Sequence, residues 1–187
     1  MKVYRINKVS ELNNLCNSEQ NKNNDVCYIV KHDSLAIGTG KYPNSYSKDK
    51  IAKYGIGDND VFNGEYFGGT IVCFPNDLSI VWITKEDNDA ALHCLEEVCK
   101  YLNSKNLIVR RSGNDLLLYD NTNAYKVASC AKGTLNSGIV INSLHISIGI
   151  DLDIIKDICN KPMLKIPKGL AEYNINADEI IQEIIPL

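Results

Sequence analysis

The stretch that decides the fold expected for this chain is residues 63–82, NGEYFGGTIVCFPNDLSIVW. Gly68 and Gly69 precede one apolar run, residues 75–77 form a turn signal, and a second apolar run begins at Leu78. Paired glycines allow close approach of the backbone to a neighbour, because they carry no Cβ and accept positive φ. The pattern predicts a β-hairpin, either a plain one or one whose wall lies against a small ligand.

Composition places the chain among ordinary globular proteins. It has 187 residues, 44% hydrophobic and 23% charged, which fits a single domain over residues 1–187. A net charge of -3 gives no electrostatic reason to expect nucleic acid or an anionic membrane as a partner. No apolar run is long enough to span a bilayer and no signal-peptide core is present, so a cytoplasmic location is expected. The seven scattered cysteines contain no Cys-x-x-Cys and predict neither disulfides nor a zinc site.

Hydrophobic periodicity predicts an α+β fold with a mixed or antiparallel β-sheet covered by helices on one face. The clearest helix spans residues 87–103, with Asp87 or Asn88 as its cap. Further helices are expected at 9–19, 47–54, 152–160 and 177–185. Strands are expected at 26–30, 35–40, 107–109, 114–119 and 125–130, and twice within 137–149, with an alternation that continues to Ile150. Residues 55–63 read as a loop.

Three short motifs occur in a fixed order along the chain. They are Gly68-Gly69-Thr70 before the turn, Ser112-Gly113-Asn114-Asp115-Leu116, and Lys126-Val127-Ala128-Ser129. In this order, over roughly residues 30–172, the sequence resembles the catalytic domain of the biotin and lipoate protein ligase family. The strand end Ile37-Gly38 and the late segments 146–152 and 167–170 are similar to further motifs of that family.

The resemblance implies a class II biotin/lipoyl-ligase-like fold and an enzyme that works with ATP and Mg²⁺. Such an enzyme activates lipoate or a medium-chain carboxylic acid as an acyl-adenylate, then transfers the acyl group to a lysine of a lipoyl-type carrier protein. By the same resemblance, Lys126 is the catalytic residue and Asp115 the metal ligand. The implied substrate- and nucleotide-binding residues are Gly68, Gly69, Thr70, Asn114, Asp115 and Ser129. A lysine there offsets charge that develops on the carboxylate and phosphate.

Several positions depart from the family pattern. Residues 63–67 contain Glu65 where the family has phosphate-binding arginines, and a carboxylate there would repel phosphate by about 1 kcal/mol or more. Thr70 replaces a third glycine, Phe74 a histidine and Ser129 a further glycine, and the biotin-ligase Gly-Arg-Gly-Arg signature is missing. The alternative hypothesis is therefore a non-catalytic member that binds a small acid, an acylated carrier or a protein partner.

A third hypothesis is a cysteine-dependent acyltransferase. The family's nucleophile slot holds Lys168 here, and Cys159 on the preceding helix is the remaining candidate, although it is expected in the core. His32, His93 and His145 are far apart in sequence, so each is expected to be structural. A homodimer or an accessory chain is expected to complete the catalytic unit.

Overall fold

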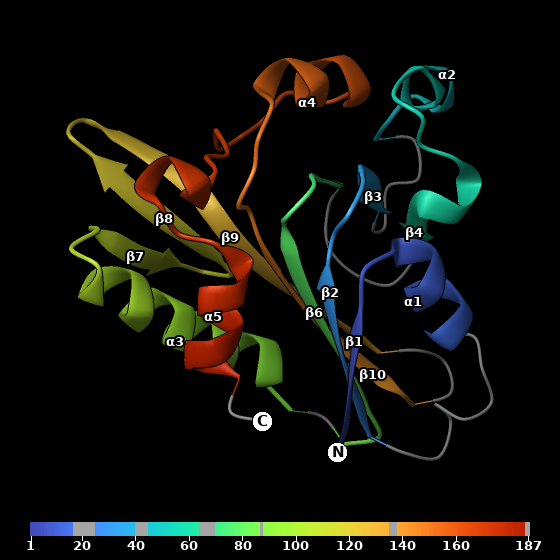
Figure 1. Cartoon of the computed structure of the whole chain (residues 1–187), viewed down its shortest axis with the longest axis horizontal. Coiled ribbons are helices and arrows are strands. Elements are labelled where there is room, and N and C mark those ends of the chain that lie inside the picture. The colour runs from blue at the N-terminus through green and yellow to red at the C-terminus, as the bar shows by residue number, and fades with distance from the viewer. Residues whose placement is uncertain (17–24, 40–44, 64–69, 87, 135–137, 186–187) are drawn as a thin grey trace.

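The computed structural model describes residues 1–16, 25–39, 45–63, 70–86, 88–134 and 138–185. These residues form a large sheet, a smaller sheet and the helices around them (Figure 1). The large sheet has seven strands in the order β1 (Lys2–Ile6), β2 (Val26–Lys31), β6 (Leu78–Thr84), β10 (Val140–Ile146), β9 (Asn123–Thr134), β8 (Asp115–Asp120) and β7 (Val109–Ser112). The smaller sheet has the order β4 (Val61–Asn63), β3 (Ala36–Thr39) and β5 (Ile71–Cys73). Both sheets combine one parallel pair with antiparallel pairs, so the predicted α+β fold with a mixed sheet is confirmed.

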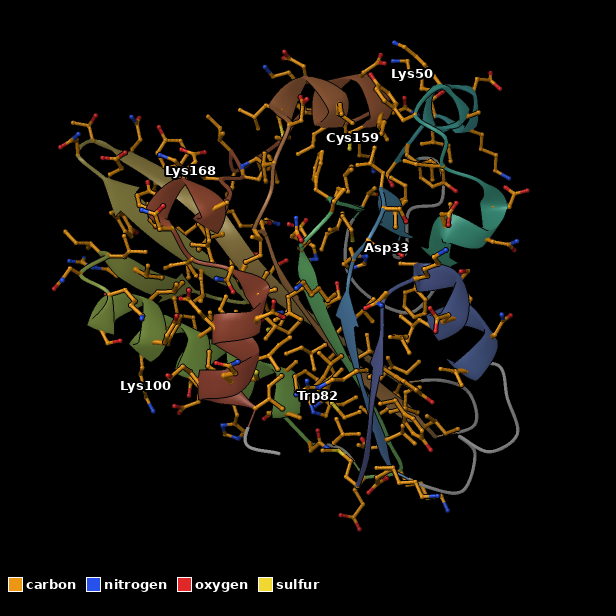
Figure 2. All side chains as sticks on the ribbon, viewed as in Figure 1. Asp33, Lys50, Trp82, Lys100, Cys159 and Lys168 are labelled. Atoms are coloured by element: carbon orange, nitrogen blue, oxygen red, sulfur yellow. The ribbon has the colours of Figure 1, made fainter. Side chains whose placement is uncertain are left out.

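Two helices cover one face of the large sheet, α3 (Ala90–Ser104) and α5 (Ala177–Ile184) (Figure 1). Leu95, Val98 and Leu102 of α3 recur at helical spacing and are fully buried in the main core. Each such side chain contributes about 1.5–3 kcal/mol through burial. Trp82 joins this core, whereas Lys100 on the outer side of α3 points away from it (Figure 2). The helix begins later than predicted, and Asn88 accepts a hydrogen bond from the first amide of α3.

The opposite face of the large sheet lies against the smaller sheet and α1 (Val9–Cys16). Leu12 packs with the large sheet, whereas Val9 packs with Ala36 and Cys73 of the smaller one. The remaining helices among the described residues are α2 (Lys48–Lys53), α4 (Leu152–Ile158) and the short 3-10 helices Asp58–Asp60 and Leu170–Tyr173. The predicted loop at 55–63 thus contains a 3-10 turn and β4. None of the described helices combines the length and apolar character required to cross a membrane.

The predicted β-hairpin around residues 75–77 is wrong. The turn exists, but β5 pairs with β3 in the smaller sheet and β6 lies between β2 and β10 in the large one. The two strands diverge because Asn76 donates its backbone N–H to the carbonyl of His32, and the amide of His32 donates to the carbonyl of Asp77. These bonds attach the turn to the end of β2, and the strands on either side of the turn do not pair with each other.

The Asp77 carboxylate fastens this turn to a third segment and is itself 0% exposed. Its Oδ2 accepts the amide of Phe74 at 2.9 Å, and its Oδ1 accepts the amides of Ile148 at 2.6 Å and Gly149 at 2.9 Å. A Cβ on Gly149 would lie 3.2 Å from the carbonyl oxygen of Pro75, so the close approach favours glycine. The strand expected to continue to Ile150 therefore ends at Ile146, because the amides of Ile148 and Gly149 turn to Asp77.

We expect Asp77→Ala to destabilise the protein by about 3 kcal/mol or more, since it leaves buried amides without an acceptor. Urea denaturation of the purified chain measures this change. Asp151→Ala is the matched control, because Asp151 also accepts two amides, at the exposed N-terminus of α4, and should cost only about 1 kcal/mol. Equal losses in the two variants would contradict the role given to Asp77.

Candidate functional site

A row of polar side chains crosses the large sheet on the face away from α3 and α5. Ser79 pairs with His145, His145 pairs with Ser129, and Ser129 pairs with Asp115, across four adjacent strands. Directly paired residues project to the same face of a sheet, so these four side chains lie in one line. The strand register, which joins segments far apart in the sequence, creates this row.

Lys126 joins the row through an irregularity in β9. It is three residues from Ser129, a spacing that would place it on the opposite face of a regular strand. A register shift between Leu116 and Leu117 pairs Leu117 with Lys126 and returns the lysine to the face of Asp115. The Lys126 Nζ lies 3.8 Å from the Asp115 Oδ1. Both of its backbone polar groups bond to segment 166–168, because the amide of Lys126 donates to the carbonyl of Ile166 and its carbonyl accepts the amide of Lys168.

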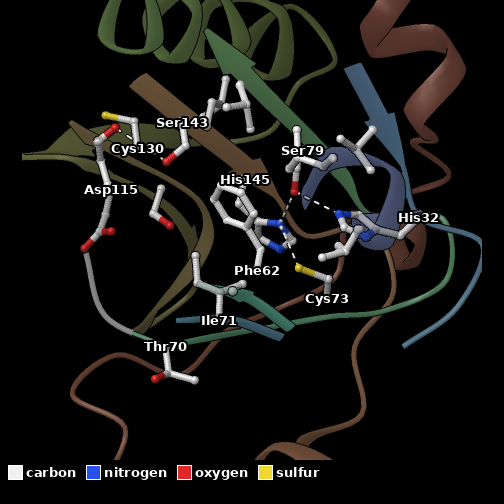
Figure 3. A pocket seen from close by; sticks show the side chains of 18 of the residues that line it. His32, Phe62, Thr70, Ile71, Cys73, Ser79, Asp115, Cys130, Ser143 and His145 are labelled. Carbon is white, nitrogen blue, oxygen red and sulfur yellow. Dashed lines mark hydrogen bonds between the residues drawn. The ribbon is translucent and has the colours of Figure 1, made fainter. Parts of the chain in front are cut away.

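A cavity of about 200 Å³ lies between the two sheets, with the polar row as one wall (Figure 3). Thr70, Ile71 and Cys73 line the opposite wall, and Phe62 contributes from β4. Val9 and Leu12 of α1 also line it. Apart from the row, most of the lining is apolar, so the cavity suits the hydrocarbon part of a small ligand.

A larger cavity of about 620 Å³ adjoins the first and is lined in part by residues 161–165. The two cavities share lining residues, namely Thr70, Ile71, Asp115, Lys126, Ser129 and His145. Lys161 and Lys165 line only the larger one. Lys126 therefore lies where an apolar cavity meets a cavity edged with ammonium groups.

Charge in the larger cavity is mainly positive. The Lys165 Nζ donates to the Asp115 Oδ2 at 2.5 Å, and Asp115 is the one acidic residue among the described lining residues of either cavity. A carboxylate or phosphate is thus favoured near Lys126. The predicted Mg²⁺ site at Asp115 has a single protein carboxylate that already pairs with Lys165, so phosphate oxygens would have to complete it.

Most of the predicted site residues that the structure describes come together. Lys126, Thr70, Asp115 and Ser129 line both cavities, and the Thr70 hydroxyl hydrogen-bonds with that of Ser45. Asn114 lines neither cavity; its carbonyl accepts the amide of Cys130 at 2.8 Å and so supports the β8–β9 pairing. Gly68 and Gly69 lie outside the described residues.

The two residues considered for a cysteine-dependent acyltransferase, Cys159 and Lys168, do not lie together at one cavity. Cys159 lines the larger cavity, but burial raises the pKa of its thiol, which disfavours the nucleophilic thiolate. Lys168, in the slot expected for a nucleophile, lines neither cavity. Its ammonium group lies over the rings of Tyr125 and Tyr173, at 4.7 and 5.0 Å from their centroids.

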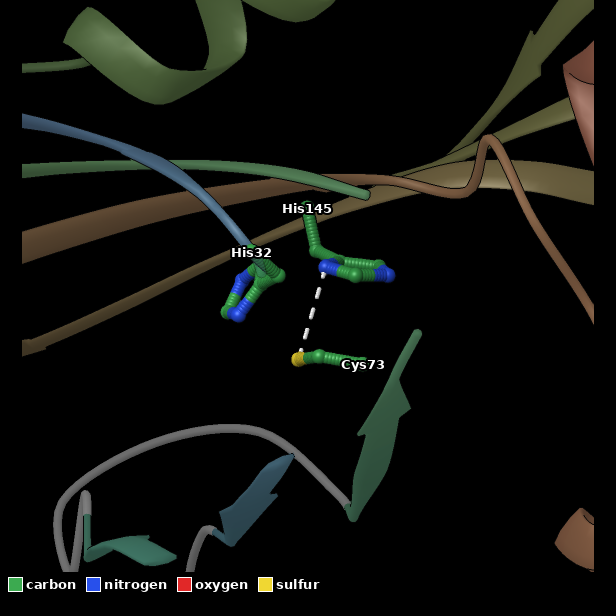
Figure 4. Close-up of side chains that lie close together, drawn as sticks. All are labelled: His32, Cys73 and His145. Atoms are coloured by element: carbon green, nitrogen blue, oxygen red, sulfur yellow. Dashed lines mark hydrogen bonds between the residues drawn. The ribbon is translucent and has the colours of Figure 1, made fainter. Parts of the chain in front are cut away.

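A buried cluster that sequence spacing did not indicate contains His32, Cys73 and His145 (Figure 4). The Cys73 Sγ lies 3.8 Å from the His145 Nδ1. The Ser79 hydroxyl lies 3.1 Å from the same nitrogen and 2.9 Å from the His32 Nε2. The His145 Nε2 faces the Asp77 Oδ2 at 3.5 Å. His93, the third histidine, is exposed on α3.

Charges in this cluster shift the pKa values of its members. Burial alone would raise the pKa of the Cys73 thiol, but the two imidazoles outweigh it and lower that pKa to about 6. Burial disfavours the imidazolium of His145, yet Cys73 and Asp77 raise its pKa to about 10. By contrast, burial raises the pKa of Cys27 to about 12. The Cys73 thiol is therefore easier to ionise than the Cys27 thiol, because two imidazoles face Cys73 whereas burial alone acts on Cys27.

No family model matches the sequence, and no curated protein matches it. Solved structures do resemble this fold. A bi-partite lipoate protein ligase from Thermoplasma acidophilum aligns over 99% of this chain and 81% of its own, with 14% identity and a TM-score of 0.70. A P. falciparum protein in complex with lipoate aligns over 98% and 58%, with 15% identity and a TM-score of 0.71.

A lipoate-protein ligase A bound with ATP aligns over 99% of this chain and 83% of its own, with 16% identity and a TM-score of 0.67. At these identities the likeness concerns the fold, and it extends over nearly the whole chain. The order of the three sequence motifs resembles the same family. The chain therefore has the fold of the lipoate protein ligases.

Proposed function

We propose that this protein is a lipoate ligase-like enzyme that activates lipoate or a medium-chain acid with ATP and transfers it to a carrier-protein lysine. The position of Lys126 at the junction of the two cavities carries this proposal. One neighbour in fold is a lipoate protein ligase described with its E2 lipoyl domain, which supports a lipoyl-type carrier as the acceptor. Another neighbour is bound with ATP, which supports ATP as the second substrate. Because the first is bi-partite, an accessory chain is part of the proposal.

The acid occupies the smaller cavity, with its hydrocarbon part between the sheets and its carboxylate toward Lys126. Ile71 and Ser143 line this cavity from opposite sheets, and Ser143 lies one pleat beyond His145 on the same face of β10. In this proposal, the depth of the cavity beyond Lys126 limits the length of the acid's hydrocarbon chain.

The nucleotide phosphates occupy the larger cavity, where Lys126, Lys161 and Lys165 supply the positive charge that arginines supply in the family. A carboxylate oxygen attacks the α-phosphorus, pyrophosphate leaves, and an acyl-adenylate forms. The carrier amine then attacks the acyl carbon, and AMP leaves as the amine loses its proton. Lys126 lowers the barrier by offsetting the negative charge that develops between carboxylate and phosphorus.

We expect Lys126→Ala to reduce acyl-adenylate formation by about 100-fold or more, because the developing charge loses its compensating cation. Pyrophosphate release with ATP and lipoate or octanoate measures the rate, and thermal unfolding should be nearly unchanged. Lys132→Ala is the matched control, since Lys132 lies on the same strand but lines neither cavity, and its rate should equal that of the unaltered chain. Full activity of Lys126→Ala would overturn the proposal.

We expect Ser143→Leu to weaken binding of lipoate by about tenfold or more, because the added methylenes occupy the smaller cavity. Binding of ATP should be unaffected. Isothermal titration with each ligand separates the two effects, and Ser143→Ala, which adds no volume, should bind lipoate normally. Equal loss of both ligands in Ser143→Leu would argue against separate cavities for acid and nucleotide.

A non-catalytic protein that binds the acid alone is the second candidate. The ion pair between Lys165 and Asp115 favours it, because this contact neutralises one of the charges that phosphates would use. Thermal unfolding with each ligand distinguishes the candidates. A shift with lipoate but none with ATP and Mg²⁺, together with no pyrophosphate release, would favour the second candidate.

A further inference from the structure

The geometry points to a binding site for one divalent transition-metal ion of the zinc type, held by His32, Cys73 and His145. The site lies in the smaller cavity at the end away from Asp115 (Figure 3). It does not rest on the proposed function, because it is argued only from these side chains and their neighbours.

The ligand atoms are close enough to share an ion. One atom from each of the three residues lies within 4.8 Å of the others, and Cys73 Sγ and His145 Nδ1 are 3.8 Å apart. In a tetrahedral zinc site, bond lengths of about 2.0–2.3 Å put neighbouring ligand atoms about 3.3–3.6 Å apart. Binding therefore requires movements of roughly 1 Å, which side-chain rotation can supply.

The ligand types select the metal. A thiolate and two imidazoles suit Zn²⁺, Co²⁺ or copper and do not suit Mg²⁺ or Ca²⁺, which prefer oxygen ligands. All three side chains are buried, with exposed fractions of 3% for His32, 5% for Cys73 and 8% for His145. A metal here would thus be shielded from bulk water except through the cavity.

A neighbouring carboxylate orients the central ligand. The His145 Nε2 is buried without a hydrogen-bond partner among the described residues and faces the Asp77 Oδ2 at 3.5 Å. Histidines that bind metal commonly direct the other ring N–H to a carboxylate, which fixes the tautomer. Asp77 is immobilised by three backbone amides, so it orients the His145 ring with Nδ1 toward Cys73, where a bound ion would displace the Nδ1 proton.

The ion would connect the two sheets and leave one position open. His32 directly follows β2 and His145 lies on β10 of the large sheet, whereas Cys73 ends β5 of the smaller one. Because all three line the cavity, the fourth coordination position opens into it and takes water or a ligand oxygen or sulfur. Ser79 must give up its hydrogen bond to the His145 Nδ1 when the ion binds.

The test is a titration of the full chain with Co²⁺ and then with Zn²⁺. Before the titration, a chelator removes bound metal and any affinity tag is cleaved off, and a non-thiol reductant keeps the cysteines reduced. We expect one Co²⁺ per chain, with a thiolate-to-cobalt charge-transfer band and the visible absorption of a four-coordinate ion, both lost when Zn²⁺ displaces it. Cys73→Ser should abolish the charge-transfer band, and His145→Ala should weaken binding by at least about 100-fold. Ser79→Ala should keep the band, because its hydroxyl is not a ligand.

Matched controls are present in the chain. Cys130 lines the same cavity outside the cluster, and His93 is exposed on α3, so Cys130→Ser and His93→Ala should bind Co²⁺ normally. The unaltered chain provides a test that needs no variant. Zn²⁺ should slow maleimide labelling of Cys73 at least about tenfold and leave labelling of Cys130 unchanged, as read by mass spectrometry. These measurements use neither acid nor ATP, so they are independent of ligase activity.

The inference would be overturned by a band that survives in Cys73→Ser or disappears in Cys130→Ser. It would equally be overturned if neither ion bound the unaltered chain, or if Zn²⁺ protected both cysteines alike.

Discussion

The buried carboxylate of Asp77 holds together the three segments that meet beside the cavity. It accepts amides from the turn before β6 and from the segment that follows β10, while the backbone of the same turn bonds to His32. A buried charge is stable only where donors compensate for lost hydration, and here backbone amides do so. Because the turn is held in this way, β5 leaves β6 and starts a second sheet, and the space between the sheets becomes the cavity.

The two faces of the large sheet have different roles. One face packs on α3 and α5 and forms the main core, whereas the other carries the row from Ser79 to Asp115. The strand irregularity in β9 adds Lys126 to this second face, at a point where the chain from 166 to 168 fixes its backbone. A rigid core behind the sheet thus positions polar groups that face a cavity.

The chain has the ligase fold, and two sets of polar residues line its cavities. Lys161 and Lys165 provide positive charge in the larger cavity, and the cluster around Cys73 occupies the smaller one. The lysines suit a nucleotide or another anion, and the cluster suits a soft metal ion. Both features lie on the same side of the sheet as Lys126, in cavities that share this lysine as a lining residue or adjoin it.

The sequence by itself determined the fold class and the α3 helix, and it predicted Lys126, Asp115 and Ser129 as one group, which the structure places along the same two cavities. These follow from local periodicity and from motifs whose order along the chain is visible without coordinates. It could not show that β5 and β6 separate, because that choice depends on which distant strands each one meets. Nor could it bring His32 and His145 together or turn Lys126 onto the face of Asp115. Those placements come from strand register and from one irregularity in β9, and register is set by long-range pairing that spacing along a single chain does not encode.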